Sequence, residues 1–321
     1  MAAETFPLLM RIVSASVSVS KRAGNIIRDV LKKGELGIVE KGKNDLQTEA
    51  DRSAQRCIVA SLHRQFPKVA IFGEEQLSPY EKIDESMIEA GFAEEVLKET
   101  CPENLRKVED EEIVIWVDPL DGTSEFTQGL LDHVTVLIGI AVKGKAMAGV
   151  IYQPYFNYQA GPDATVGRCI WGVIGLGSFG FEKRYPPENK NIITTTRSHS
   201  NRMVTEAVEA CEPSEVVRVG GAGHKVLLLI EGKVHAYVFA SKGCKKWDTC
   251  APEAVLHAIG GTLTDLCGVP MQYHHQVQKG NFGGVLATLQ KHEWYVSKIP
   301  NEIKDAFRQE PDGGPVQMTR L

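Results

Sequence analysis

Two aspartates that follow an apolar strand are the residues of this chain best suited to chemistry. The run Ile113–Val117 is apolar, and the string Asp118-Pro-Leu-Asp121-Gly-Thr123 follows it directly. The proline fixes φ at one turn position, and the glycine accepts backbone conformations that other residues resist. Such a turn can direct both carboxylates and the Leu120 carbonyl at one point, and this is the oxygen-donor set that Mg²⁺ prefers. A simple Asp-Pro or Asp-Gly turn is the alternative, and the length of the string argues against it.

Further carboxylates lie at the ends of predicted elements. Glu74 follows the apolar strand predicted over 69–72, at the carboxyl end where α/β proteins usually collect functional groups. Its neighbour Glu75 fits a solvated loop or a supporting role equally well. Asp248 lies where a strand predicted over 236–240 leads into a helix, so it can cap that helix or stand rigidly beside a metal. Pro252, in the predicted first turn, favours the cap, and the two roles are compatible.

Two polar residues carry little information when they are taken alone. Asp51 follows Thr48 by three residues, which is the spacing of a capping box and favours a structural role. His199, without its neighbours, is typical of a surface or hydrogen-bonded histidine. Both residues gain a functional interpretation only from their sequence context.

A glycine-rich segment predicts an anion site in the second half of the chain. Gly220-Gly-Ala-Gly223 precedes the helix predicted over 224–231, so backbone N–H groups and a helix N-terminus face whatever binds there. Lys225 adds a positive charge beside them. This site could hold a second phosphate that is not cleaved, and so select bisphosphates over monophosphates. A tight turn with a solvated Lys225 is the alternative.

Other nucleotide- and metal-binding motifs either lack the structural context that they require or are absent from the sequence. Gly175–Gly180 matches GxGxxG, but charges and two prolines follow it where a dinucleotide site requires a helix. We interpret it as a glycine-rich hairpin. The sequence contains no GxxxxGK[ST] loop and no EF-hand spacing.

The first half of the chain predicts helices on one face of a mostly antiparallel sheet. The predicted elements, in order, are an amphipathic helix over 7–31, a helix from Gln47 to near Pro67, strand 69–72, an acidic, solvated segment over 80–112 with a helix inside it, strand 113–117, and successive strands over 134–181. This half is therefore expected to be α+β.

The second half alternates between strands and helices. The predicted elements are strand 192–194, helix 200–210, strand 216–219, helix 224–231, strand 236–240, helix 249–259 and strand 262–266. Such alternation predicts a layered α/β region with mainly parallel pairing. We place the boundary near 184–191, which gives an α+β domain over 1–187, an α/β domain over 188–308 and a mobile tail over 309–321.

Composition narrows the class of protein. The 321 residues are 43% hydrophobic and 24% charged, as in ordinary globular proteins. The formal charge of −5, without a long basic run, argues against polymeric nucleic acid as a partner. No apolar run is long enough to span a bilayer, and the first six residues lack the features of a signal peptide. Seven scattered cysteines fit free thiols in a reducing cytosol rather than zinc, so we expect a cytoplasmic protein. Nothing in the sequence demands a dimer, and we expect a monomer.

Several segments together resemble one family. Asp45-Leu-Gln-Thr-Glu-Ala-Asp51, Gly73-Glu-Glu75, Asp118–Thr123 and Trp247-Asp248 followed by Gly260-Gly261 resemble, in order, the signatures of the lithium-sensitive, Mg²⁺-dependent phosphatases. That superfamily includes inositol monophosphatase, inositol polyphosphate 1-phosphatase and bisphosphate nucleotidases. The segments Thr194–Ser200, Arg218–Gly223 and Gly243–Asp248 are most similar to the animal nucleotidases. The resemblance implies a layered α-β-α-β-α sandwich.

The resemblance also implies a role for each matching residue. The implied ligands of roughly two to three Mg²⁺ ions are Glu74, Asp118, the Leu120 carbonyl, Asp121 and Asp248. Asp51 and Thr123 are implied to orient and deprotonate an attacking water. The implied substrate contacts are Thr196, His199, Gly221 and Lys225. Inhibition by Li⁺ is implied by the resemblance alone.

These roles predict a phosphatase of nucleotide metabolism and sulfate assimilation. The expected reaction is in-line attack by water on the 3′ (or 2′) phosphate of adenosine 3′,5′-bisphosphate, giving 5′-AMP and phosphate. Its phosphosulfate analogue and inositol 1,4-bisphosphate are possible further substrates. The alternatives are an inositol polyphosphate 1-phosphatase or inositol monophosphatase, and a non-catalytic protein that binds metal or nucleotide. No expected catalytic residue is missing, which argues against the last alternative.

Overall fold

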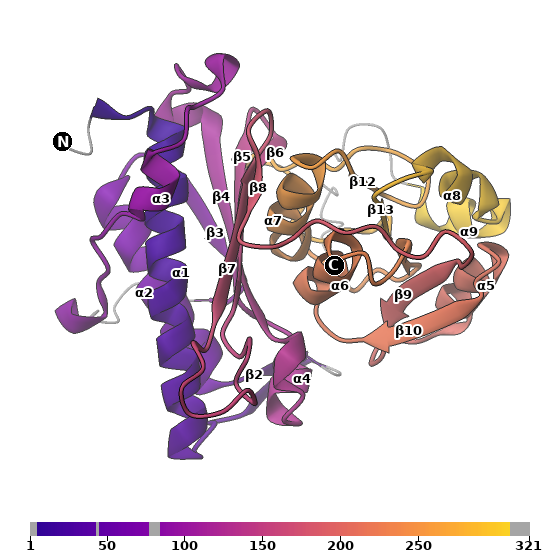
Figure 1. Cartoon of the computed structure of the whole chain (residues 1–321), viewed down its shortest axis with the longest axis horizontal. Helices are drawn as coiled ribbons and strands as arrows, with labels where there is room; N and C mark the ends of the chain where they lie inside the picture. The colour runs from indigo at the N-terminus through magenta and orange to yellow at the C-terminus, as the bar shows by residue number, and fades with distance from the viewer. Residues whose placement is uncertain (1–4, 43–44, 77–83, 309–321) are drawn as a thin grey trace, which may run out of the picture.

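Helices and sheets alternate across the computed structural model of the chain, which describes residues 5–42, 45–76 and 84–308 (Figure 1). A six-stranded sheet is covered by α1 (Leu8–Lys33) and α2 (Glu49–Gln65). On its other side α6 (Ala222–Ile230) and α7 (Lys246–His257) separate it from a five-stranded sheet. The predicted α-β-α-β-α order is confirmed. The tail predicted over 309–321 lies outside the described residues.

The first sheet has the strand order β3-β4-β5-β6-β7-β8. Its strands are β3 (Ala70–Gly73), β4 (Ile113–Asp121), β5 (Thr135–Val142), β6 (Lys145–Gln153), β7 (Arg168–Val173) and β8 (Gly177–Phe179). Only the β3–β4 pair is parallel, so the predicted mostly antiparallel sheet is confirmed. The predicted glycine-rich hairpin is the β7–β8 turn. β4 is buried along its whole length and runs further than predicted, as far as Asp121.

Helix α7 packs closely against the first sheet because two strand residues in contact with it are glycines. A Cβ atom added at Gly139 in β5 would stand 2.6 Å from the Ala251 nitrogen, and one added at Gly149 in β6 would stand 2.4 Å from the Ala251 carbonyl oxygen. No other residue fits such an approach. The second half of the chain is therefore fixed directly on the first sheet, and the hydrophobic core between the sheets crosses the predicted boundary at 184–191.

The second sheet is mixed, and the prediction of mainly parallel pairing is wrong. Its strands, in the order β10-β9-β11-β13-β12, are β9 (Ile192–Thr196), β10 (Glu215–Val219), β11 (Ala236–Phe239), β12 (Thr262–Thr264) and β13 (Val285–Thr288). β9 pairs in parallel with β10 and β11, whereas β13 is antiparallel to both β11 and β12. The chain returns from β12 to β13 without a crossover helix, so β13 enters the sheet reversed.

Several shorter elements differ from the sequence prediction. Those not predicted are β1 (Val39–Gly42), β2 (Asp45–Gln47), β13, α4 (Thr123–Thr127), α8 (His292–Lys298) and α9 (Asn301–Phe307). The predicted helix over 200–210 is α5 (Arg202–Ala210). The acidic segment contains the predicted helix, α3 (Glu94–Leu97), but its described part is not merely solvated. Val96 is buried, and the Ser14 hydroxyl of α1 donates to the Ala93 carbonyl at 2.8 Å.

Two further expectations from composition can be compared with the structure. All seven cysteines are free, as expected. Among the described residues, no helix combines the length and apolar character that a bilayer crossing requires.

Candidate active site

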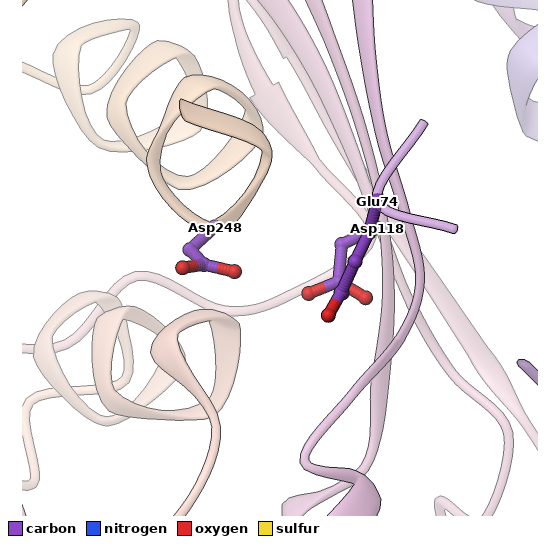
Figure 2. Close-up of side chains that lie close together, drawn as sticks. All are labelled: Glu74, Asp118 and Asp248. Carbon is purple, nitrogen blue, oxygen red and sulfur yellow. The ribbon is translucent and has the colours of Figure 1, made fainter. Parts of the chain in front are cut away.

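Three carboxylates from different elements converge between the two sheets. Glu74 follows β3, Asp118 lies in the neighbouring strand β4, and Asp248 lies in the first turn of α7. One carboxylate oxygen of each residue lies within 4.8 Å of the others. Figure 2 shows Asp248 facing the other two side chains across the gap between helix and sheet. The parallel pairing of β3 with β4 brings Glu74 and Asp118 to the same edge of the sheet.

The electrostatics of this cluster fit a bound cation. Burial raises the pKa of Glu74 to about 8, and the charge of Asp248 contributes to that shift. Burial and the neighbouring carboxylates raise the pKa of Asp118 well above its ordinary value. Burial also raises the pKa of Asp248 to about 6, and Asp121 adds to the effect. One buried carboxylate, Asp118, and two partly buried ones that oppose its ionisation form the donor set that Mg²⁺ would stabilise.

Asp248 is placed by the start of α7. The helix begins at Lys246, three residues before its predicted start, so Asp248 is in the third helical position and not the N-cap. Its Oδ2 accepts a hydrogen bond from the Lys245 backbone nitrogen at 2.6 Å. Pro252 consequently lies in the second turn and not the first. The predicted cap role is thus corrected in position, while the side chain still satisfies the helix terminus.

Asp121 is held differently from the three clustered carboxylates. It accepts hydrogen bonds from the Thr135 hydroxyl at 2.7 Å and from the Ala222 and Gly223 backbone nitrogens at 2.8 Å each. The last two groups belong to the N-terminus of α6. The Ala222 and Gly223 nitrogens are therefore bound to Asp121 and not free for a substrate phosphate, while the anion site at this terminus stays a prediction. Asp121 still lines the cleft, and its role as a metal ligand stays a prediction.

Asp51 and Thr123 form the predicted pair. Asp51 lies in the first turn of α2, where its Oδ2 accepts a hydrogen bond from the Thr48 nitrogen at 2.7 Å and completes a capping box. Its Oδ1 accepts from the Thr123 hydroxyl at 2.8 Å. The same hydroxyl lies 3.1 Å from the Leu120 carbonyl oxygen. Burial raises the pKa of Asp51 to about 6. The capping interpretation is confirmed, and the same bonds orient Asp51 toward Thr123.

Glu75 links the β1–β2 hairpin to the end of β3. It is buried, its Oε1 lies 2.8 Å from the Lys41 ammonium, and Gln47 also donates to its carboxylate. The Lys41 ammonium lies 3.2 Å from Glu74 as well. The solvated-loop alternative for Glu75 is therefore wrong, and its contacts support the segment that carries Glu74.

The opposite wall of the cleft carries the predicted substrate contacts. Thr196 ends β9, and its hydroxyl accepts a hydrogen bond from the His199 nitrogen at 3.0 Å. The Lys225 ammonium donates to the Gly221 carbonyl at 2.9 Å and lies 5.2 Å from the centre of the Tyr237 ring. Lys225 is only 5% exposed, so the solvated alternative for it is wrong.

These groups surround one cleft with a volume of about 340 Å³. All predicted site residues line it except Asp51, which reaches it through the Thr123 hydroxyl. The structure thus brings the eleven predicted residues, from six separate segments, to a single place. Their individual roles stay predictions.

The sequence analysis missed Glu125, which packs against the part of the cleft that carries the predicted substrate contacts. Its buried carboxylate lies 3.1 Å from the Arg197 guanidinium. A Cβ atom added at Gly220 would stand 1.9 Å from the Glu125 carboxyl carbon. Glu125 therefore fixes the path of the Gly220–Gly221 turn. Only its position two residues after the Asp118–Thr123 string could have drawn attention to it.

Lys245 was also missed as a cleft residue. The signal was available, because Lys245 lies within the Gly243–Asp248 segment that carries part of the family resemblance. The paired lysines at 245 and 246 gave no reason to separate a cleft residue from a buried one.

Comparison with known proteins gives consistent matches. Residues 9–304 match the family model described as the Inositol monophosphatase family. The 3′(2′),5′-bisphosphate nucleotidase 1 of Homo sapiens is 58% identical over 301 residues, which are 94% of this chain and 97% of that protein. The protein of the same name from Rattus norvegicus is 56% identical over 306 residues, 95% of this chain and 99% of its own.

A solved structure shows the same fold at lower identity. The IMPase of Thermotoga maritima superposes with a TM-score of 0.64 at 20% sequence identity, covering 91% of this chain and 98% of its own. The arrangement of two sheets with helices between them is therefore shared well beyond the range of close sequence similarity.

Proposed function

The chain belongs to the inositol monophosphatase family, and from this premise we propose that it is a metal-dependent 3′(2′),5′-bisphosphate nucleotidase. The reaction removes the 3′ (or 2′) phosphate of adenosine 3′,5′-bisphosphate and leaves 5′-AMP. The observation that carries this proposal is the placement of the Glu74, Asp118 and Asp248 cluster beside the Asp51–Thr123 pair in one cleft. Close similarity to animal nucleotidases over nearly the whole chain supports the nucleotide substrate.

The three clustered carboxylates would hold Mg²⁺, with the Leu120 carbonyl and Asp121 as further oxygen donors. When bound, Mg²⁺ neutralises phosphate charge and makes a nearby water more acidic. Without a cation the cleft would repel a phosphate dianion, because it presents several acidic side chains. This donor set, of oxygen atoms only, favours Mg²⁺ over softer metals.

Thr123 and Asp51 supply the proton path for water. The Thr123 hydroxyl donates its proton to Asp51 Oδ1, which leaves its oxygen lone pairs free to accept a proton from water. Asp51 in turn keeps its orientation through its bonds to Thr48. A threonine hydroxyl alone is a very weak base, so the pair must act as a unit. We propose direct in-line attack, which transfers one solvent oxygen to phosphate and inverts the configuration at phosphorus.

We propose that Thr196, His199, Gly221 and Lys225 contact the rest of the substrate. They line the same cleft as Glu74 and Asp118. The phosphosulfate analogue and inositol 1,4-bisphosphate are proposed as slower substrates, and Li⁺ as an inhibitor that occupies one Mg²⁺ position. The cytoplasmic location and the monomeric state stay predictions from the sequence.

Phosphate release from adenosine 3′,5′-bisphosphate tests the proposal. We expect release of one phosphate with Mg²⁺, no release with EDTA, and loss of release in Asp118→Asn. The matched control is Asp132→Asn, an exposed aspartate outside the cleft. Turnover of inositol phosphates without turnover of the nucleotide would instead favour an inositol phosphatase. Bound Mg²⁺ with no turnover of either class would favour a binding protein.

A further inference from the structure

His133 lies between the two glycine turns of the site. A Cβ atom added at Gly122 would stand 3.3 Å from the His133 carbonyl oxygen, and one added at Gly221 would stand 2.7 Å from it. Both glycines have positive φ angles, 94° and 72°, so neither turn accepts a side chain there without strain. Gly122 lies between Asp121 and Thr123, and Gly221 is a predicted substrate contact. The backbone of His133 is thus in close contact with both groups of predicted site residues.

The His133 side chain extends this contact to the second turn. Its Nδ1 accepts a hydrogen bond from the Gly220 backbone nitrogen at 3.4 Å. The segment that carries the ring is held by its own backbone bonds. The Leu130 nitrogen donates to the Glu125 carbonyl at 2.9 Å, and the His133 nitrogen donates to the Leu130 carbonyl at 3.2 Å. The ring is therefore held where it can fix the first residue of the Gly220–Gly221 turn.

The His224 ring, in the first turn of α6, supports this arrangement. Its centroid lies 4.7 Å from the centroid of the His133 ring, and the two planes are inclined by 26°. Burial lowers the pKa of His224 to about 3. Burial also lowers the pKa of His133, against the opposing charge of Glu125. Both rings are therefore neutral at pH 7, so they stack without repulsion and the His133 Nδ1 keeps the lone pair that an acceptor needs.

We propose that His133 is a positioning residue that holds the Gly220–Gly221 turn in the form that binds substrate. This inference rests on the proposed function, in which Gly221 contacts the substrate. The neutral Nδ1 accepts the Gly220 N–H, and the stacked His224 ring keeps the imidazole from turning away. Without the acceptor the turn can leave this form, so substrate binding weakens while the Asp51–Thr123 pair is unchanged. The effect should therefore appear in KM and not in kcat.

Two substitutions at His133 separate the acceptor from the ring. His133→Leu removes the acceptor, whereas His133→Asn retains one, because the amide oxygen of asparagine can take the place of Nδ1. We expect KM for adenosine 3′,5′-bisphosphate to rise about threefold to tenfold in His133→Leu, as the loss of one neutral hydrogen bond predicts, with kcat near the wild-type value. KM in His133→Asn should stay near that of the wild type.

His235→Leu is the matched control. The His235 Nδ1 also accepts a backbone hydrogen bond, from the Ile192 nitrogen at 3.0 Å, but His235 lies outside the cleft. Its replacement should lower Tm, measured by differential scanning fluorimetry, and leave KM unchanged. A loss of stability in His133→Leu without a change in KM would overturn the inference. An equal rise of KM in His133→Leu and His133→Asn would also overturn it, because the ring and not the acceptor would then matter.

The tautomer of His133 gives a readout that does not depend on turnover. Long-range proton–nitrogen NMR spectra of the wild type with isotope-labelled histidine should show an unprotonated Nδ1 and a protonated Nε2 at neutral pH. The signal is assigned by its loss in His133→Asn. A proton on Nδ1 would overturn the inference, and this measurement decides the case if His133→Leu does not fold. If the wild type cleaves no nucleotide, the proposed function has failed, and the spectrum still tests the hydrogen bond to Gly220.

Discussion

The two walls of the cleft are built in different ways. Glu74 and Asp118 lie on or directly after neighbouring strands, so the register of a buried sheet fixes their spacing. The facing wall consists of a loop after β9, the turn before α6 and the loop before α7. Strand register tolerates little variation, whereas loops can change without loss of the fold. The comparison suggests that the first wall determines the chemistry and the second wall determines the substrate.

The largest effect should come from Thr123, which follows the first-wall strand β4, and from its hydrogen-bond partner Asp51. In Thr123→Ala the water loses its proton acceptor, and in Asp51→Asn the hydroxyl loses its carboxylate partner. We expect kcat to fall about 10²- to 10⁴-fold in either variant. The Mg²⁺ concentration for half-maximal activity should change little, since neither residue belongs to the carboxylate cluster.

Thr127→Ala is the control for this pair of variants. Thr127 lies in the same short helix, where its hydroxyl donates only to the Ser124 carbonyl at 2.9 Å. Its kcat should stay near the wild-type value. A wild-type kcat in Thr123→Ala would assign the proton transfer to another group and remove the distinction between the two walls.

A smaller effect, on KM more than on kcat, should come from the second wall. In Gly220→Ala the new methyl group would stand 1.9 Å from the Glu125 carboxyl carbon, so the turn that carries Gly221 must shift. Overpacking of this kind costs about 1–3 kcal/mol. We expect KM for the nucleotide to rise about tenfold, with little change in Mg²⁺ dependence.

Gly243→Ala is the matched control, because Gly243 lines the same cleft but an added Cβ atom there meets nothing closer than 3.7 Å. Gly220→Ala combined with Glu125→Ala removes the clash, so KM should fall part of the way back to the wild-type value. A fall in kcat without a rise in KM would show that the second wall also orients the reacting groups.

The response of thermal stability to Mg²⁺ should depend on pH through the carboxylate cluster, in which Asp248 of α7 faces Glu74 and Asp118 of the first wall. The folded pKa of Glu74, about 8, lies above its ordinary value of 4.5, and that of Asp248, about 6, lies above 3.8. Without metal, these groups therefore destabilise the fold progressively as pH rises from about 4 to 8, because the folded state retains protons that the unfolded state has released.

Bound Mg²⁺ should remove this penalty, since it stabilises the ionised carboxylates. We expect the rise in Tm on adding Mg²⁺ to be larger at pH 8 than at pH 5.5, as measured by differential scanning fluorimetry with EDTA as the reference. The same increase at both pH values would contradict a cation site formed by these carboxylates.

The first wall was largely predictable from the sequence because its residues are close to one another in sequence or follow strongly apolar strands. The Asp118–Thr123 string predicts both the turn and its oxygen donors, and the apolar run before it predicts β4. The capping spacing of Thr48 and Asp51 is likewise local. The sequence does not show that the α2 cap faces Thr123, because this contact depends on how a helix packs against a sheet.

The second wall was harder to predict because its contacts are long-range. The glycines at 220–223 correctly indicate the start of a helix, but nothing local shows that Asp121, about a hundred residues earlier, occupies its N–H groups. The antiparallel entry of β13 was missed for the same reason. Short apolar segments such as 285–288 carry no signal of direction, which is set by the loop that precedes them.

The smallest effect should come from Glu253, which tests whether a buried carboxylate outside the cluster behaves differently from those inside it. This carboxylate lies on α7 with Asp248, and burial likewise raises its pKa to about 8. Its carboxylate accepts a hydrogen bond from the Tyr273 hydroxyl at 2.5 Å and lies 3.9 Å from His257 Nδ1, rather than beside another carboxylate. Since its folded pKa exceeds the ordinary 4.5, Glu253 destabilises the fold as pH rises toward 8, and Glu253→Gln does not titrate. The variant should therefore gain Tm relative to the wild type between pH 6 and pH 8.5.

That gain should be the same with Mg²⁺ and with EDTA, because Glu253 is not part of the carboxylate cluster. The exposed Glu302→Gln in α9 is the control and should show no pH-dependent difference. If Glu253→Gln instead changes the Tm response to Mg²⁺, the proton on Glu253 is linked to the metal centre through α7. Membership in the carboxylate cluster would then not be the feature that distinguishes metal-linked carboxylates from other buried acids. The metal centre would also depend on a residue further along α7.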